Sequence, residues 1–215
     1  MTTIELVIFD LDDCILDTNT FRPHMQERMR QVMDAFEIPD YARRHAEHML
    51  KTASPIAVAR ECDLPKQVCR ALLDAYRTID VPACVKTYGD EHHIADIKAE
   101  CVLVTAGFES VQYAKIARVG IAKLFSEIHV VGSSVDHFNK QLKFQEILKE
   151  RDLEPWQSVV VGDSPHAELR AGLSFGMITV QTLRPGVTRW DRANFHITSL
   201  YELPDIISGI RHGES

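Results

Sequence analysis

The feature that most constrains the fold is an apolar run near the N-terminus that ends abruptly in carboxylates. Residues Ile4 to Phe9 have the length and β-branched content of a buried strand, and Asp10, Asp12 and Asp13 follow it. Two unit charges about 4 Å apart repel by roughly 4 kcal/mol near a protein surface. A cation is the obvious compensation, and ligands of open α/β sheets bind at the carboxyl ends of the strands. This segment therefore predicts a hard-metal site at a strand tip.

Composition limits the classes of protein to which the chain can belong. Its 215 residues suffice for one domain, or one domain with an insertion, and for a sizeable core. A net charge of -7 argues against nucleic acid as a partner. The cysteines are odd in number and lack C-x-x-C spacing, which argues against a disulfide framework or zinc site and favours a reducing, cytoplasmic compartment. We expect no signal peptide and no membrane partner, because the first apolar run is short and leads into aspartates.

Two kinds of pattern divide the chain. Residues from about Thr20 to Arg77 show helical periodicity, and Pro39-Asp40, Ser54-Pro55 and Leu64-Pro65 each favour the start of a helix. From Cys101 onward, short apolar runs alternate with amphipathic segments. The expected strands are 101–105, 128–131, 158–162, 177–181 and 195–198, and the expected helices are 110–119, 141–151 and 167–175.

Strands that alternate with helices predict an α/β fold in which a parallel sheet carries helices on both faces. The first strand belongs to this sheet although a helical block separates it from the others. The economical interpretation is a helical domain inserted after the first strand. We expect residues 1–17 and 85–215 to form the α/β core and residues 18–84 a small all-helical domain.

Later strands also end in candidate functional residues. Thr105 precedes Ala106-Gly107, and a hydroxyl followed by such a turn can present donors to an anion. Asp163 follows the buried run 158–162, and Glu168 lies five residues further on. Each has a plainer interpretation when taken alone. Threonine suits strands, an aspartate before Ser-Pro caps a helix, and an acid is favourable near a helix N-terminus.

Two lysines, Lys140 and Lys143, open the helix before the strand that ends at Asp163. Lysines in such positions are usually solvated. A lysine that points at an anion bound at a strand tip would instead hold a phosphate. Lys140 is preferred, because Lys143 immediately precedes Phe144, an apparent core position.

The order of these elements is strand-Asp-x-Asp, strand-Thr, Lys, strand-Gly-Asp. In this order and spacing the chain resembles the haloacid dehalogenase-like (HAD) superfamily over nearly its whole length. Lys140, with Lys143 in reserve, fits the third motif, and Glu168 is the second acid of the fourth. Family members usually carry the shorter Asp at the position of Glu168, and they differ from this chain at Cys14 and Ala106. The other matching segments are Val7-Ile8-Phe9-Asp10-Leu11-Asp12, Val102-Leu103-Val104-Thr105 and Gly162-Asp163-Ser164.

The resemblance implies a Rossmann-like HAD core with a helical cap, and a Mg²⁺-dependent phosphatase acting on a small phosphorylated metabolite. Such a metabolite is a nucleotide, a sugar phosphate or a phosphoglycolate-like ester. Asp10 would form an aspartyl-phosphate, and Asp12 would serve as acid and then as base. The implied phosphate-binding residues are Thr105, Ala106 and Lys140. The implied Mg²⁺ ligands are the carboxylates of Asp10 and Asp163, the main-chain carbonyl of Asp12, and Glu168 directly or through water.

Two other functions are disfavoured by the motifs and their spacing. A dehalogenase of the superfamily generally lacks the second acid of the first motif, so Asp12 argues against it. A receiver module has no helical block between its acids and its threonine. The open alternatives are a phosphomutase of the same superfamily and a non-catalytic phospho-acceptor or binding module. Whether the protein is a monomer or a homodimer also stays open.

Overall fold

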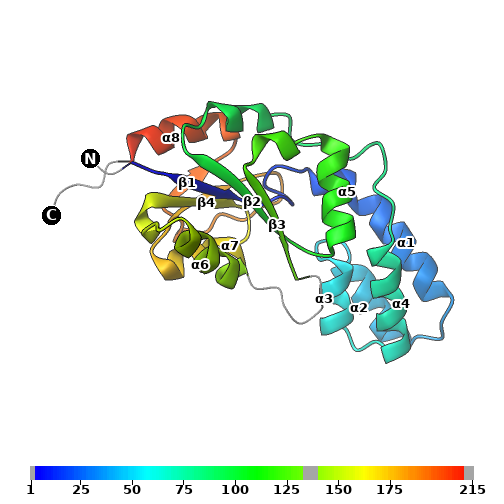
Figure 1. Ribbon diagram of the computed structural model, residues 1–215. Helices are drawn as coiled ribbons and strands as arrows, with labels where there is room; N and C mark the ends of the chain where they lie inside the picture. The colour runs from blue at the N-terminus through cyan, green and yellow to red at the C-terminus, as the bar shows by residue number, and fades with distance from the viewer. Residues whose placement is uncertain (1–2, 133–139, 211–215) are drawn as a thin grey trace.

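β1 (Leu6–Phe9) lies in the middle of a six-stranded parallel sheet whose strand order is β3-β2-β1-β4-β5-β6 (Figure 1). The computed structural model describes residues 3–132 and 140–210, and it confirms the predicted fold class. Residues 1–2, 133–139 and 211–215 of the expected core lie outside the described residues. The other strands, each within two residues of its expected bounds, are β2 (Glu100–Ala106), β3 (Glu127–Val131), β4 (Ser158–Gly162), β5 (Ile178–Thr182) and β6 (Phe195–Ile197).

The side chains of β1 point alternately to two apolar layers. Val7 and Phe9 belong to the same cluster as residues of α5 (Glu109–Val119) and α8 (Leu203–Gly209). Leu6 and Ile8 meet α6 (Lys140–Glu150) and α7 (Glu168–Phe175), which lie together on the other face of the sheet in Figure 1. Because helices cover both faces, every position of this strand is apolar and buried.

The inserted block is helical, as its sequence predicts. Each expected proline signal marks a helix start, and the side chain of Ser54 caps one of them by accepting a hydrogen bond from the amide of Ala57. The helices of the block are α1 (Arg22–Asp34), α2 (Asp40–Met49), α3 (Pro55–Glu61) and α4 (Lys66–Arg77).

The two linkers that join the block to the sheet run side by side. The amide of Asp17 donates to the carbonyl of Lys86 over 3.0 Å, and the amide of Tyr88 donates to the carbonyl of Ile15 over 3.1 Å. Both crossings of the chain therefore form one short antiparallel contact.

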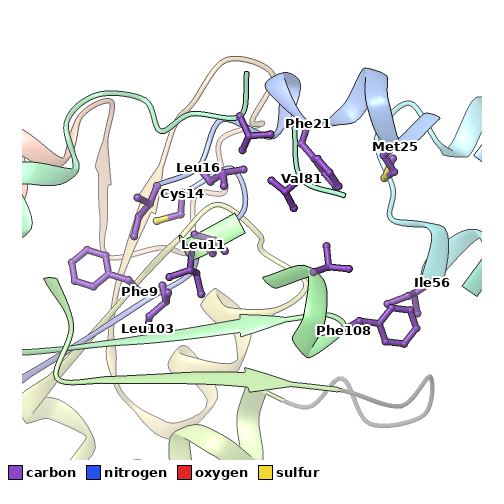
Figure 2. Close-up of a cluster of buried hydrophobic side chains, with 14 of the residues drawn as sticks. Phe9, Leu11, Cys14, Leu16, Phe21, Met25, Ile56, Val81, Leu103 and Phe108 are labelled. Carbon is purple, nitrogen blue, oxygen red and sulfur yellow. The ribbon is translucent and has the colours of Figure 1, made fainter. Parts of the chain in front are cut away.

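The helical block and the sheet share one apolar cluster (Figure 2). Phe108, at the start of α5, lies beside Ile56 of α3 and has its ring centroid 5.9 Å from that of Tyr76 on α4. The Ser110 hydroxyl donates to the carbonyl of Arg77 over 2.6 Å. α5 is thus a core element against which the block rests.

The strand order places β1 and β4 at the point where the chain reverses its direction across the sheet. Ligands of doubly wound sheets bind in the crevice at this point, outside the carboxyl ends of the strands. Phe9 pairs in register with Leu103 of β2 and Val161 of β4, so the residues that follow these strands meet at one edge. Among the residues that the structure describes, no helix is long and apolar enough to cross a bilayer.

Candidate active site

Three acids converge at the reversal point of the sheet. Asp10 follows β1, Asp163 follows β4, and Glu168 is the first residue of α7. One carboxylate oxygen from each lies within 4.8 Å of the other two. Asp10 and Glu168 are buried and Asp163 is half-buried. The structure therefore brings together three of the acids that the sequence singled out.

Lys140 bridges two of these acids. Its Nζ lies 2.6 Å from Asp10 Oδ1 and 2.9 Å from Glu168 Oε2, and its side chain is only 6% exposed. The other oxygen of Glu168 accepts a hydrogen bond from the amide of Ser164 over 2.7 Å. Lys143, the reserve candidate, pairs instead with Glu146 one turn further along α6. Of the two lysines, only Lys140 reaches the acid cluster.

The cluster holds more negative charge than its lysine balances. Burial, together with the charges of Glu168 and Asp12, raises the pKa of Asp10 despite the opposing Lys140. Burial, with Glu168 and Asp10 as neighbours, raises the pKa of Asp163 to about 9. Without a cation the cluster thus retains protons. Its donors are carboxylate oxygens, which suit a hard divalent ion such as Mg²⁺.

Asp12 is close to this cluster in sequence but makes different contacts. Lys115 Nζ on α5 lies 2.8 and 3.0 Å from its two carboxylate oxygens, and the side-chain amide of Gln112 donates to one of them over 2.9 Å. Burial alone would raise the pKa of Asp12, but the ion pair and hydrogen bonds from Lys115 and Gln112 lower it. The carboxylate is thus held in its charged form by residues of α5.

Thr105, the candidate of the second motif, is fully buried at the end of β2. Its hydroxyl accepts a hydrogen bond from the side-chain amide of Gln112 over 2.5 Å, and so keeps its own hydrogen for a second partner. Ala106 is half-buried beside it. The Gly107 amide donates to the carbonyl of Val131 over 3.0 Å, so this N–H is already used within the sheet.

Asp13 connects the site to the two linkers. It adopts a positive φ of 55°, which is uncommon for a residue with a side chain. Its carboxylate accepts hydrogen bonds from the hydroxyls of Thr18 and Tyr88, one from each linker, and lies 3.4 Å from the guanidinium of Arg22 on α1. The turn after β1 is thus fixed by contacts with the chain that leads to and from the helical block.

A cleft of about 550 Å³ opens between the block and the sheet next to this site. Arg22 and Lys51 line it from the block, and Asp163, His166 and Trp190 line it from the core. Its walls thus carry both basic and aromatic side chains close to the acid cluster.

Sequence reasoning missed Gln112 and Lys115. Both occupy the same stripe of α5 as the buried Val111 and Ile116. A glutamine and a lysine on the inward stripe of a helix are the signal that could have found them.

The fold and the site together define a class of protein: a doubly wound sheet with a helical insertion after its first strand and an acid cluster at its reversal point. The model of the haloacid dehalogenase-like hydrolases matches residues 7–181. The chain belongs to this family, and it is therefore a hydrolase.

Three known proteins are similar to this chain in sequence or in fold. A glyceraldehyde 3-phosphate phosphatase of Methanocaldococcus jannaschii is 24% identical over 236 aligned positions, which cover 97% of this chain and 99% of the relative. The structure of a HAD phosphatase from Thermococcus onnurineus has a TM-score of 0.68 at 22% identity, covering 97% of this chain and all of the other. The magnesium-bound HAD-hydrolase YfnB from Bacillus subtilis has a TM-score of 0.70 at 15% identity, covering 95% and 99%.

Proposed function

We propose that the protein is a Mg²⁺-dependent phosphatase that hydrolyses a small phosphate monoester through an aspartyl-phosphate on Asp10. The observation that carries this proposal is the position of Asp10: at the tip of the central strand, 2.6 Å from Lys140 and within reach of Asp163 and Glu168. Carboxylates and a buried lysine at this edge suit the positioning and charge stabilisation that phosphoryl transfer needs.

The residues present fit a Mg²⁺ ion. Asp10 and Asp163 would hold it through their carboxylates and Asp12 through its main-chain carbonyl, with Glu168 binding directly or through water. When bound, the ion supplies positive charge that offsets the repulsion between this acidic site and an anionic substrate.

In the first step, an Asp10 oxygen forms a bond to phosphorus while the bond from phosphorus to the leaving oxygen breaks. Lys115 and Gln112 favour the charged form of Asp12, so this carboxylate takes up its proton only when the substrate is bound. Asp12 then gives that proton to the leaving oxygen, so that an alcohol departs. Thr105 and the backbone at Ala106 would hold the phosphoryl oxygens, together with Lys140, whose ammonium carries three donors.

In the second step, water attacks the phosphorus of the aspartyl-phosphate and the Asp10 oxygen leaves as carboxylate. Asp12 takes the proton of that water, which returns both aspartates to the protonation states from which the first step began and releases inorganic phosphate. The helical block, resting on α5, would cover the site during the first step and keep bulk water out.

The substrate class is proposed only broadly. A nucleotide, a sugar phosphate and a phosphoglycolate-like ester all carry the phosphate that the site would hold, and the phosphatase name of the archaeal relative supports a phosphorylated metabolite. All five cysteines are free thiols, which supports a reducing, cytoplasmic compartment. For the oligomeric state of the protein, we propose a monomer or a homodimer.

Phosphate release from a panel of esters tests this function. Nucleoside monophosphates, sugar phosphates, phosphoglycolate and 4-nitrophenyl phosphate are incubated with the protein in EDTA, and again after Mg²⁺ is restored. We expect release only with Mg²⁺. Isomerised sugar phosphate without release would indicate a phosphomutase, and no turnover of any ester would indicate a binding module. Full activity after exhaustive metal removal would contradict the metal dependence.

A further inference from the structure

Two polar side chains, Gln112 and Lys115, lie on the inward stripe of α5 where apolar residues would be expected. Gln112 is 1% exposed and Lys115 is 3% exposed. Burying an ammonium and an amide costs free energy unless both find partners. The apolar contacts on this face of α5 come from Val111 and Ile116. Their partners therefore indicate what they do.

Those partners are two residues of the proposed site. Lys115 Nζ contacts both carboxylate oxygens of Asp12, at 2.8 and 3.0 Å. The Gln112 amide nitrogen donates both to Asp12, over 2.9 Å, and to the Thr105 hydroxyl, over 2.5 Å. One helix thus fixes groups at the tips of two neighbouring strands.

The ammonium is also held from the side of the helical block. Lys115 Nζ lies 5.0 Å from the centre of the Phe21 ring, at the start of α1, which is the distance of a cation–π contact. Asp12 and Lys115 then border a small cavity of about 130 Å³ that Phe21, Arg22 and Tyr76 line from the block. In the described structure Asp12 takes no part in the acid cluster of Asp10, Asp163 and Glu168.

We propose that Lys115 and Gln112 are positioning residues that hold the Asp12 carboxyl group toward the space under the helical block and away from the acid cluster. The inference rests on the proposed function, in which Asp12 gives a proton to the leaving oxygen. That oxygen must lie on the side of the phosphorus opposite Asp10 for an in-line displacement. If the Asp12 carboxyl group turned toward the acid cluster, it could not reach this leaving oxygen.

A positioning role predicts a specific kinetic signature. The value of kcat/KM reports steps up to the first irreversible one, here departure of the alcohol. An alkyl leaving group needs the proton from Asp12, whereas 4-nitrophenolate leaves with little help. Loss of the contacts that Lys115 and Gln112 make with Asp12 should therefore lower kcat/KM for an alkyl ester and spare the aryl ester. A purely structural role would lower both equally.

The experiment compares glycerol 2-phosphate with 4-nitrophenyl phosphate as substrates of the full-length, Mg²⁺-loaded protein. For Lys115→Met we expect the ratio of the two kcat/KM values to fall by roughly 10- to 100-fold, within the range that a general acid contributes. Lys115→Arg, which keeps the charge and donors, should restore much of the ratio. Lys123→Met, at an exposed position after α5, is the matched control and should leave it unchanged.

Two further comparisons make the test decisive. In an Asp12→Asn background, Lys115→Met should have no additional effect on the ratio, because its action passes through Asp12. If Lys115→Met does not fold, Gln112→Met carries the same test. Its contact with Thr105 should affect both esters alike and cancel in the ratio.

If kcat/KM fell equally for both esters, or fell for neither, their ratio would be unchanged and this inference would be overturned. It would also be overturned if Lys115→Met still changed the ratio in the Asp12→Asn background. Failure of the proposed function is distinguishable from these results, since the wild-type protein would then hydrolyse neither ester.

Discussion

Glu168 occupies the space that a side chain at Gly162 would fill. A Cβ built on Gly162 would lie 2.4 Å from Glu168 Oε1 and 2.5 Å from its Cγ. The glycine at the end of β4 is therefore what allows the longer acid to fold back over the strand, where Lys140 and the Ser164 amide hold its two oxygens. This explains how glutamate can stand where the family usually has aspartate.

Gly162→Ala should therefore displace Glu168. We expect a loss of about 1–3 kcal/mol in the free energy of unfolding, as for other overpacked sites, and weaker Mg²⁺ binding. Urea unfolding and calorimetric titration of the metal-free protein with Mg²⁺ measure the two effects. Gly209→Ala is the control, because a Cβ at Gly209 in α8 meets nothing within 4 Å. Unchanged stability and metal affinity in Gly162→Ala would show that the close approach is unimportant.

The raised pKa of Asp163 predicts how stability depends on pH without metal. An acid whose pKa is raised in the folded state, here from 3.8 to about 9, binds its proton more tightly when folded. The metal-free protein should therefore lose stability as pH rises from about 6 to about 8, and Mg²⁺ should restore more of it at the higher pH. Thermal unfolding in EDTA and in Mg²⁺ at both pH values measures this.

Asp163→Asn provides the control for that prediction. It removes the charge while keeping the shape, so the metal-free variant should be more stable than wild type near pH 8 and gain less from Mg²⁺. If the metal-free wild type and variant showed the same difference in Tm at both pH values, Asp163 would not be the group that titrates.

Lys140 and Lys143 differ by three residues but should differ greatly in effect. Lys140→Ala removes an ammonium 2.6 Å from Asp10, and we expect kcat to fall by about 10²- to 10³-fold, as when other charge-stabilising donors are lost. Lys143→Ala loses only the surface pair with Glu146 and should be mild. Steady-state kinetics with the best ester from the panel measures kcat for both variants. A larger loss of kcat in Lys143→Ala than in Lys140→Ala would refute the assignment of Lys140 to the third motif.

Much of the fold could be predicted because local signals agreed with the overall pattern. The proline signals predict the starts of three helices, and the apolar run 158–162 predicts both ends of β4 correctly. The acids could be located because parallel strands end at one edge. The polar pair Gln112 and Lys115 could have been noticed on the inward stripe of α5, but its contacts with Asp12 could not, since they span about a hundred residues of sequence. The shared apolar cluster between the helical block and the core was also beyond sequence reasoning.

The central claim is that Asp10 attacks phosphorus, and the position of the covalent phosphate tests it most directly. The Mg²⁺-loaded protein is mixed with ³²P-labelled substrate, quenched rapidly in acid, and digested for peptide mapping. The account predicts label on the peptide that contains Asp10, at Asp10 itself. It also predicts neither label nor turnover in Asp10→Asn, and slower release of phosphate in Asp12→Asn. Label on another residue, or robust turnover by Asp10→Asn, would contradict it.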